Sequence, residues 1–160
     1  MLNPRKPYMS QPHSIENNSH KWIIVAEGDP SLCIGIVNYL LFHGYSVTGV
    51  GSAYDFYRQV FEEPYAVAII DGALPDQSGL LVAEYARKNT AMRIITLSEQ
   101  ITYAAVPATI NAGADINFVK PVDFRLLAAS VANLFSRLNA PNPVFMDQNI
   151  TETLQKPSRT

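Results

Sequence analysis

Apolar and polar positions alternate along the middle of the chain with two different periods. Short apolar runs predict five strands, at residues 22–26, 45–50, 65–70, 93–97 and 116–119. Between them, apolar residues recur at helical spacing, which predicts helices from Pro30 to just before Gly44 and at residues 52–62, 78–88, 104–112 and 123–138. The first helix is predicted to pack through one face, formed by Cys33, Ile36, Val37, Leu40 and Leu41.

Strands that alternate one by one with helices predict a parallel sheet with helices on both faces. Right-handed crossovers place the carboxyl ends of all strands along one edge, where open α/β sheets form their sites. Polar side chains follow four of the five predicted strands: Glu27 and Asp29, then Asp71, Ser98 and Lys120. We therefore expect these side chains to converge at one edge of the sheet.

The residue types at this edge suit phosphoryl chemistry. Clustered carboxylates cost free energy unless a cation joins them, and Mg²⁺ favours a few carboxylates together with phosphate and water. A lysine and a hydroxyl bind further phosphoryl oxygens. Asp71 ends the apolar run Ala68-Ile69-Ile70 and precedes a turn containing Pro75, so it is the predicted acceptor of a phosphoryl group.

Composition narrows the class of protein. A chain of 160 residues is long enough for one domain with a complete core, and its net charge of −2 favours no contact with nucleic acid. The single cysteine excludes an internal disulfide, and no apolar run could cross a membrane, so we expect a cytoplasmic protein. The polar ends, residues 1–20 and 139–160, predict a flexible N-terminal tail and a C-terminal tail or linker around a domain at 21–138.

Several short motifs occur in the order and spacing of one family. They are Val25-Ala26-Glu27-Gly28-Asp29-Pro30, Ile69-Ile70-Asp71-Gly72-Ala73-Leu74-Pro75, Thr96-Leu97-Ser98, Ala112-Gly113-Ala114-Asp115 and Phe118-Val119-Lys120-Pro121. Together they resemble the receiver domain of two-component response regulators. The resemblance implies a flavodoxin-like, doubly wound (βα)5 three-layer sandwich with parallel strand order 2-1-3-4-5. It also implies phosphorelay signal transduction, a sensor histidine kinase or phosphotransfer protein as partner, and no enzymatic activity of the chain's own.

Carried over position by position, the resemblance assigns roles to five residues. Asp71 matches the phosphoacceptor, Glu27 the first acid of the metal pair, and the backbone carbonyl of Ala73 a metal ligand. Ser98 matches the switch hydroxyl, and Lys120 matches the lysine that bonds the phosphoryl group. The implied cofactor is Mg²⁺, and the bond that follows Lys120 matches one that is usually cis in the family.

The chain departs from the family at several positions. Gly28 stands in place of the second acid; Asp29 is a candidate substitute ligand, although its place at a helix start suits a cap. Asn117 replaces the switch aromatic, and Phe118 falls on the opposite face of its strand. Pro107 falls within the fourth predicted helix, where it would cost about 3 kcal/mol in mid-helix unless that helix starts there. We expect an atypical receiver with weak Mg²⁺ dependence. The alternative is a phosphorylation-independent pseudo-receiver that dimerises or binds proteins, as in a transcriptional regulator.

The last predicted helix carries no charge between Arg125 and Arg137. Ser130 and Asn133 lie on its predicted outward stretch, and residues 103–108 are also uncharged. A contiguous uncharged surface favours burial against a partner. We therefore expect a phosphate-independent homodimer through the fourth helix, fifth strand and fifth helix.

Two rival functions fit the sequence less well. A phosphatase similar to haloacid dehalogenases needs a nucleophilic aspartate where this chain has Ile69. A flavodoxin-like carrier of FMN needs a phosphate cradle after the first strand, but residues 27–30 include two acids.

Overall fold

The computed structural model describes residues 22–100 and 105–138 of the chain. Its elements are β1 Trp22–Ala26, α1 Pro30–Phe42, β2 Ser46–Val50, α2 Ala53–Glu62, β3 Val67–Asp71, α3 Gly79–Asn89, β4 Arg93–Ser98, α4 Ala105–Asn111, β5 Ile116–Val119 and α5 Phe124–Leu138. The strands pair in parallel in the order β2-β1-β3-β4-β5. The predicted flavodoxin-like fold is confirmed. The predicted tails lie outside the described residues.

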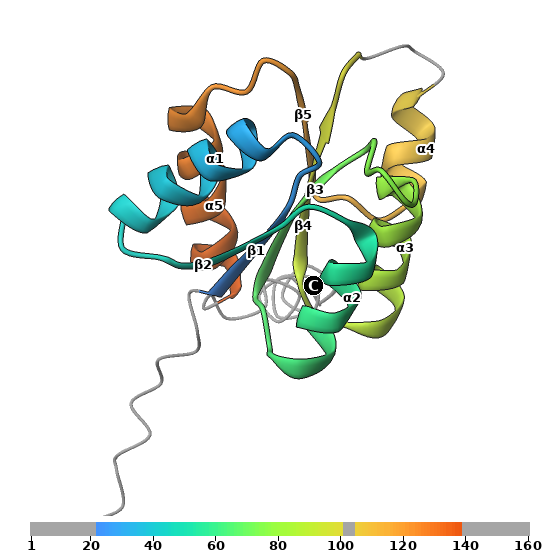
Figure 1. Ribbon diagram of the computed structural model, residues 1–160, viewed down its shortest axis with the longest axis horizontal. Helices are drawn as coiled ribbons and strands as arrows, with labels where there is room; N and C mark the ends of the chain where they lie inside the picture. Colours follow the sequence, from blue (N-terminus) through green and yellow to red (C-terminus); the bar gives the residue numbers. More distant parts are fainter. Residues whose placement is uncertain (1–21, 101–104, 139–160) are drawn as a thin grey trace, which may run out of the picture.

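Helices cover both faces of the sheet (Figure 1). α1 and α5 lie on one face, and α2, α3 and α4 lie on the other. Successive strand residues enter two separate cores: Ile24 and Ile70 pack on the side of α2 and α3, whereas Ile23 and Ile69 pack on the side of α1 and α5. Burial of each such isoleucine stabilises the fold by about 1.5–3 kcal/mol. This two-sided burial explains why the central strands are apolar throughout.

Local sequence signals set most of the helix boundaries. The Asp29 and Ser52 side chains cap α1 and α2 by accepting hydrogen bonds from Ser31 N at 2.9 Å and Asp55 N at 3.1 Å. Gly44 follows α1 with a φ of 85°, in the left-handed region that glycine adopts without strain. The helix predicted at residues 78–88 begins at Gly79, and Ser78 caps it, because its hydroxyl accepts a hydrogen bond from Leu80 N at 3.3 Å.

Two details of the sequence prediction need correction, and the open question of Pro107 is resolved. Leu41 is 47% exposed, because it lies about 100° further round α1 than the buried Leu40. β3 begins at Val67, and the preceding Tyr65 instead places its hydroxyl 3.0 Å from Gln59 Oε1. Pro107 is the third residue of α4, so it lies in the first turn, where a missing N–H breaks no intrahelical bond.

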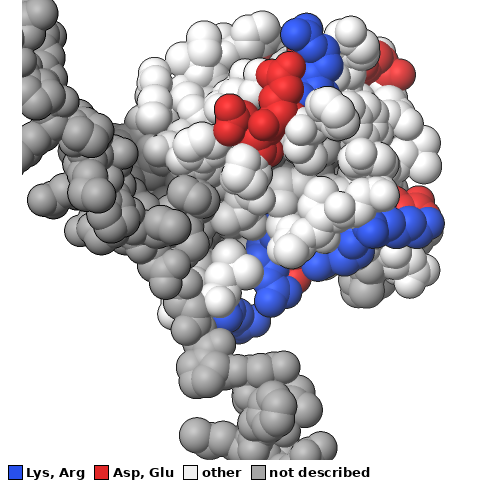
Figure 2. All heavy atoms as spheres, turned by 90° about the horizontal axis from the view of Figure 1, so that it is seen from below, with Lys and Arg blue, Asp and Glu red and all other residues white. Residues whose placement is uncertain are grey.

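The two edges of the sheet differ in character. The carboxyl ends of the strands lie at the top of Figure 1, and the loops that follow β1, β3 and β5 meet there. The view from below, onto the amino ends of the strands, shows most of the Lys and Arg in a row across its lower part and a group of Asp and Glu in its upper part (Figure 2). This face therefore carries both signs of charge, with the basic side chains gathered on one side.

Candidate functional site

The predicted site residues lie at the carboxyl edge of the sheet. Asp71 is the last residue of β3, Glu27 directly follows β1, and Lys120 directly follows β5. The Asp71 and Glu27 residues are only 3% and 1% exposed. Because β1 and β3 are neighbours in a parallel sheet, their ends bring these two carboxylates together. The predicted convergence is thus observed for all three.

The Lys120 ammonium holds this group together. Its Nζ lies 3.1 Å from Glu27 Oε2, 3.3 Å from Asp71 Oδ1 and 3.5 Å from Glu99 Oε1. The Lys120 side chain is 15% exposed, whereas Glu99 is 73% exposed and contributes a peripheral carboxylate. Sequence reasoning missed Glu99. Its place directly after Ser98, at the same strand end, was the signal that could have found it.

These contacts shift the pKa values of the buried groups. Burial raises the pKa of Glu27, and the neighbouring Asp71 charge adds to that rise. Burial also raises the pKa of Asp71, but the Ala73 amide and the Lys120 ammonium outweigh it and hold the pKa below its ordinary value. Burial lowers the pKa of Lys120, but the hydrogen bond to Glu27 and the charge of Asp71 raise it overall. At neutral pH the site therefore contains an ionised Asp71 beside a protonated Lys120.

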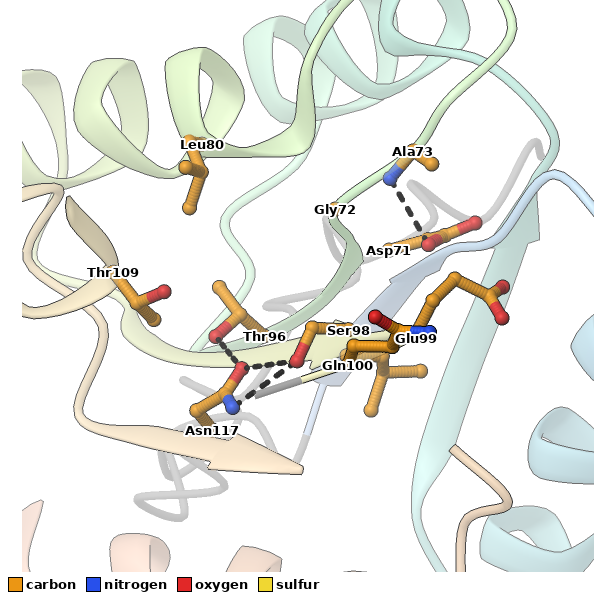
Figure 3. Close-up of a pocket in the computed structure, with 11 residues that line it drawn as sticks. Asp71, Gly72, Ala73, Leu80, Thr96, Ser98, Glu99, Gln100, Thr109 and Asn117 are labelled. Atoms are coloured by element: carbon orange, nitrogen blue, oxygen red, sulfur yellow. Dashed lines mark hydrogen bonds between the residues drawn. The ribbon is translucent and has the colours of Figure 1, made fainter. Parts of the chain in front are cut away.

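The loop after β3 positions the two oxygens of Asp71 differently. Oδ1 accepts a hydrogen bond from the Ala73 amide at 3.1 Å, as Figure 3 shows, and also faces Lys120. A Cβ built on Gly28 would lie 3.8 Å from Asp71 Oδ2 and 3.7 Å from the carbonyl oxygen of Ala73. Asp71 Oδ2 and the Ala73 carbonyl therefore both face Gly28, on the side of the loop after β1.

Asp76 anchors the same loop to α2. Its carboxylate accepts hydrogen bonds from Ala53 N at 2.8 Å and Tyr54 N at 2.9 Å, which lower its pKa. These partners lie 23 and 22 positions earlier in the chain. No local pattern in the sequence identifies such a contact.

Ser98 and Asn117 form a polar network with Thr96 beside Asp71 (Figure 3). Thr96 Oγ1 donates to Asn117 Oδ1 at 2.9 Å, and Asn117 Nδ2 donates to Ser98 Oγ at 3.2 Å. Thr96 and Asn117 are direct neighbours across β4 and β5. Phe118 packs with the α1 and α5 core, so its predicted place on the opposite face is confirmed. Thr96 was not predicted as a member of the site.

The donor set fits a divalent cation only in part. Within residues 22–100 and 105–138, no group of three or more His, Cys, Asp and Glu side chains is arranged to hold a metal ion. Glu27 Oε2, however, is buried and lacks a hydrogen-bond partner, although it is paired in charge with Lys120. Together with Asp71 and the Ala73 carbonyl it supplies the oxygen atoms that Mg²⁺ prefers. Asp29 uses its carboxylate to cap α1, and we leave it out of this ligand set.

The strand order and the acidic site at the carboxyl edge of the sheet define a class of flavodoxin-like domain. Comparison with known proteins identifies the family. The family model for the response regulator receiver domain matches residues 23–132 of this chain. The chain belongs to this family and is a receiver domain of a two-component response regulator. Receiver domains generally bind Mg²⁺ at their acidic site and interact with histidine kinases or phosphotransfer proteins.

Curated relatives share the receiver part of their sequences with this chain. TorR, the TorCAD operon transcriptional regulatory protein of Escherichia coli O157:H7, is 25% identical over 117 residues, which are 73% of this chain and 51% of TorR. The transcriptional regulatory protein BasR of Escherichia coli K12 is 27% identical over 118 residues, which are 73% of this chain and 53% of BasR. This chain therefore spans about half the length of these relatives.

Solved structures agree with the fold. DrrB of Thermotoga maritima, an OmpR/PhoB homologue, has a TM-score of 0.68 and 25% identity over 72% of this chain and 52% of DrrB. A CheY-like receiver domain protein from Methanospirillum hungatei JF-1 has a TM-score of 0.67 and 26% identity over 73% of this chain and 95% of its own. In the part of the chain that the structure describes, no helix has the length and apolarity to span a bilayer.

Proposed function

We propose that Asp71 accepts a phosphoryl group from a sensor histidine kinase or a phosphotransfer protein, and that the chain acts as an acceptor rather than as an enzyme. The observation that carries this proposal is the state of the Asp71 carboxylate. It is buried, ionised and fixed through Oδ1 by the Ala73 amide and by Lys120. A fixed carboxylate with a nearby cation suits nucleophilic attack on phosphorus.

We assign Asp71 Oδ2 as the attacking oxygen, because Oδ1 is held by its two partners. Attack on the phosphorus of a phosphohistidine forms an O–P bond and breaks the P–N bond. The electron pair leaves with the imidazole, which takes up a proton. Lys120 would neutralise the acyl phosphate product, and the Ser98 hydroxyl, which donates to Asn117 Oδ1 at 3.3 Å, would donate to a phosphoryl oxygen instead.

Glu27, Asp71 and the Ala73 carbonyl would hold Mg²⁺, which when bound neutralises charge on the transferring group. Gly28 supplies no carboxylate to this set, and Lys120 already pairs with both acids. Binding of Mg²⁺ must therefore compete with an existing ion pair while lacking one ligand. These two features support weak Mg²⁺ dependence and slow phosphorylation, which is the sense in which we propose an atypical receiver.

The proposed homodimer through α4, β5 and α5 has partial support. Leu126 is 60% exposed, and Ala129 and Asn133 also lie on the exposed face of α5. Together with Ile116 of β5, Ser130 and the charged Arg137 at the end of α5, they line a shallow hollow. Of the predicted uncharged segment at 103–108, Pro107 and Ala108 are exposed and the other residues lie outside those whose side chains are described. Sedimentation of the unphosphorylated protein is the direct test of the dimer. We keep a cytoplasmic location, and no contact with nucleic acid by this chain itself, as proposals.

Intact mass spectrometry with acetyl phosphate and Mg²⁺ tests the phosphoacceptor. We expect the wild-type chain to gain one phosphoryl group slowly and Asp71→Asn to gain none, because an amide oxygen is a poor nucleophile. A conventional receiver under the same conditions calibrates the rate. Modification of both variants would place the phosphoryl group elsewhere. No modification of either would favour the phosphorylation-independent module, and rapid, complete modification of the wild type would contradict the atypical assignment.

Gly28→Asp is expected to strengthen Mg²⁺ binding by about tenfold, because it adds a carboxylate next to the proposed ligand atoms. A Cβ at this position meets Pro75 Cδ at 3.4 Å, which is an ordinary contact, so the side chain fits. Mg²⁺ titration followed by NMR measures the affinity, and tenfold corresponds to about 1.4 kcal/mol. Asn38→Asp is the matched control, because it adds the same carboxylate at an exposed position of α1, eight residues after the helix start. Equal affinity in Gly28→Asp and wild type would contradict the proposed ligand set.

A further inference from the structure

Exposed aromatic side chains gather on α2 and α3, on the side of the sheet opposite α1 and α5 (Figure 1). Phe61 and Tyr54 of α2 are 92% and 65% exposed. Tyr85 of α3 is also exposed, and its ring meets that of Tyr57 edge-on, with centroids 4.9 Å apart. Leu81, one turn before Tyr85, is exposed as well. These five residues make up the α2/α3 aromatic face.

The aromatic residues of α2 share one flank of that helix. Phe61 lies one turn after Tyr57 and two turns after Tyr54, so the three side chains point to the same side. The contact of Tyr57 with Tyr85 shows that this side faces α3. The Tyr57 hydroxyl also donates a hydrogen bond to Gln77 Oε1 at 2.8 Å, which fixes its ring. The face is therefore an ordered, contiguous surface rather than a scatter of single side chains.

The chemistry of this face favours a proline-rich partner. Single exposed apolar side chains are common, but a contiguous group of them marks an interaction site. Aromatic surfaces bind Pro-x-x-Pro segments, because the polyproline II helix is ordered before it binds. Two prolines three residues apart lie about 9 Å apart along such a helix. Tyr54 and Phe61 lie about 10 Å apart along α2, so the two spacings match.

The N-terminal segment of the chain contains this pattern. Pro4 and Pro7 enclose the basic pair Arg5 and Lys6, and Pro12 follows. Because polyproline II has three residues per turn, Pro4 and Pro7 would lie on the same side of the segment. The proposed phosphoryl chemistry makes no use of these residues.

The place where the described chain begins favours the N-terminal segment over the C-terminal one. Trp22 packs against the α2 and α3 core, and with Gln59 and Glu63 of α2 it lines a pocket. α5 instead ends at Leu138, on the opposite face of the sheet. Pro7 lies 15 positions before Trp22, and a connection of that length reaches up to about 45 Å as polyproline II. This reach exceeds the length of α2, which is about 15 Å.

The charges of the segment and of α2 are complementary. In the part of the chain that the structure describes, the exposed carboxylates of Glu62 and Glu63 at the end of α2 form no ion pair. Residues 1–21 carry three Lys or Arg and one acid, whereas residues 139–160 carry two of each sign. The basic pair between the two prolines would therefore meet unpaired acids. Such charges orient a docked segment more than they add to its affinity.

We propose that residues 4–12 dock on the α2/α3 aromatic face of the same chain as a polyproline II segment, with Pro4 and Pro7 against the rings. The proposal goes beyond the proposed function, because neither Asp71 nor Mg²⁺ takes part. Tethering gives the segment an effective concentration on the order of 1 mM. A contact with a dissociation constant on the order of 0.1 mM would then cover the face about nine-tenths of the time. The docked segment would shield these exposed rings from other chains.

Methyl NMR of the full chain tests the docking, because Met9 lies two residues after Pro7 and is one of only four methionines. We expect the Met9 methyl signal to lie upfield of its position in a free peptide of residues 1–12, with nuclear Overhauser contacts to Tyr and Phe ring protons. The double variant Tyr54→Ser/Phe61→Ser should return the signal to the peptide position. Phe42→Ser is the matched control, because it removes an 88% exposed ring from α1, across the sheet, and should leave the signal unchanged.

Variants of the segment itself provide the second arm of the test. Pro4→Ser/Pro7→Ser should also return the Met9 signal to the peptide position, whereas Gln11→Ser keeps both prolines and should not. A wild-type signal identical to that of the free peptide would overturn the proposal, as would a signal unaffected by loss of the two rings or of the two prolines. A shift that disappears on dilution from about 1 mM to about 20 μM would place the segment on a second copy and would overturn docking within one chain.

Discussion

Replacement of Lys120 by methionine is expected to lower the free energy of unfolding by about 3 kcal/mol at neutral pH, because it leaves buried carboxylates unpaired. The Glu27 and Asp71 side chains are 1% and 5% exposed, and Lys120 Nζ lies within 3.3 Å of both. Methionine preserves the length and most of the packing of the side chain. The loss should therefore reflect the charge rather than a cavity.

The pH dependence of this loss distinguishes electrostatics from packing. The Asp71 pKa is lowered in the folded wild type, so its stabilising contribution is present above the ordinary pKa and is lost as the pH falls through the folded value. The Lys120 pKa is raised, so its contribution is present below the ordinary lysine pKa and is lost as the pH rises through the folded value. The loss of unfolding free energy in Lys120→Met should thus be largest between the folded pKa of Asp71 and the folded pKa of Lys120. It should shrink as the pH falls from neutral toward about 4, where both carboxylates of the variant protonate.

Denaturant titrations in the presence of EDTA, at several pH values, measure this deficit. Lys88→Met is the matched control, because Lys88 pairs with Glu84 at 2.8 Å but the two side chains are 70% and 45% exposed. An exposed i,i+4 pair contributes only about 0.3–0.5 kcal/mol. A deficit of Lys120→Met that equals that of Lys88→Met, or that does not change with pH, would contradict the electrostatic account of the site.

Gly79→Ala is expected to lower the free energy of unfolding by about 3 kcal/mol, at the upper end of what overpacking costs. Gly79 is the first residue of α3, and its amide donates to Gly72 O at 2.9 Å. A Cβ at this position would overlap the carbonyl oxygen of Asp71. It would also lie 2.7 Å from that carbonyl carbon and 2.8 Å from Gly72 Cα. All three are backbone atoms, so no rotamer change relieves the clash.

Thermal unfolding measures this effect, and a loss of this size should lower Tm by well over 10 °C for a domain of roughly 100 residues. Gly51→Ala is the matched control, because a Cβ there meets nothing within 4 Å. Its effect should be a few tenths of a kcal/mol in either direction. Comparable Tm values for the two variants would show that the loop after β3 adjusts freely. The fixed geometry that we ascribe to Asp71 would then be wrong.

The elements of this fold follow from signals that act over a few residues. The buried run that ends at Asp71, the Asp29 cap before Pro30 and the glycine after α1 each depend on neighbours in the sequence, and each is confirmed. The parallel direction of the strands then follows from their alternation with helices along the chain. The convergence of Glu27, Asp71 and Lys120 was predictable, because each lies at or directly after the carboxyl end of a strand and these ends share one edge of the sheet.

The contacts between distant residues were decided only by the tertiary structure. Lys120 donates to Glu27 across 93 positions of the chain, and its simultaneous contact with Glu99 depends on the relative placement of β4 and β5. The capping of α2 by Asp76 and the α2/α3 aromatic face depend likewise on how helices pack over the sheet. The exposure of Leu41 was also not predictable. The helix α1 is apolar nearly all round, so its sequence alone does not say which side faces the core. Periodicity and capping are local properties, so the sequence determined the elements and their order. Distances between side chains depend on crossovers and packing, so only the folded chain determined the ion pairs, the hydrogen-bond network and the α2/α3 aromatic face.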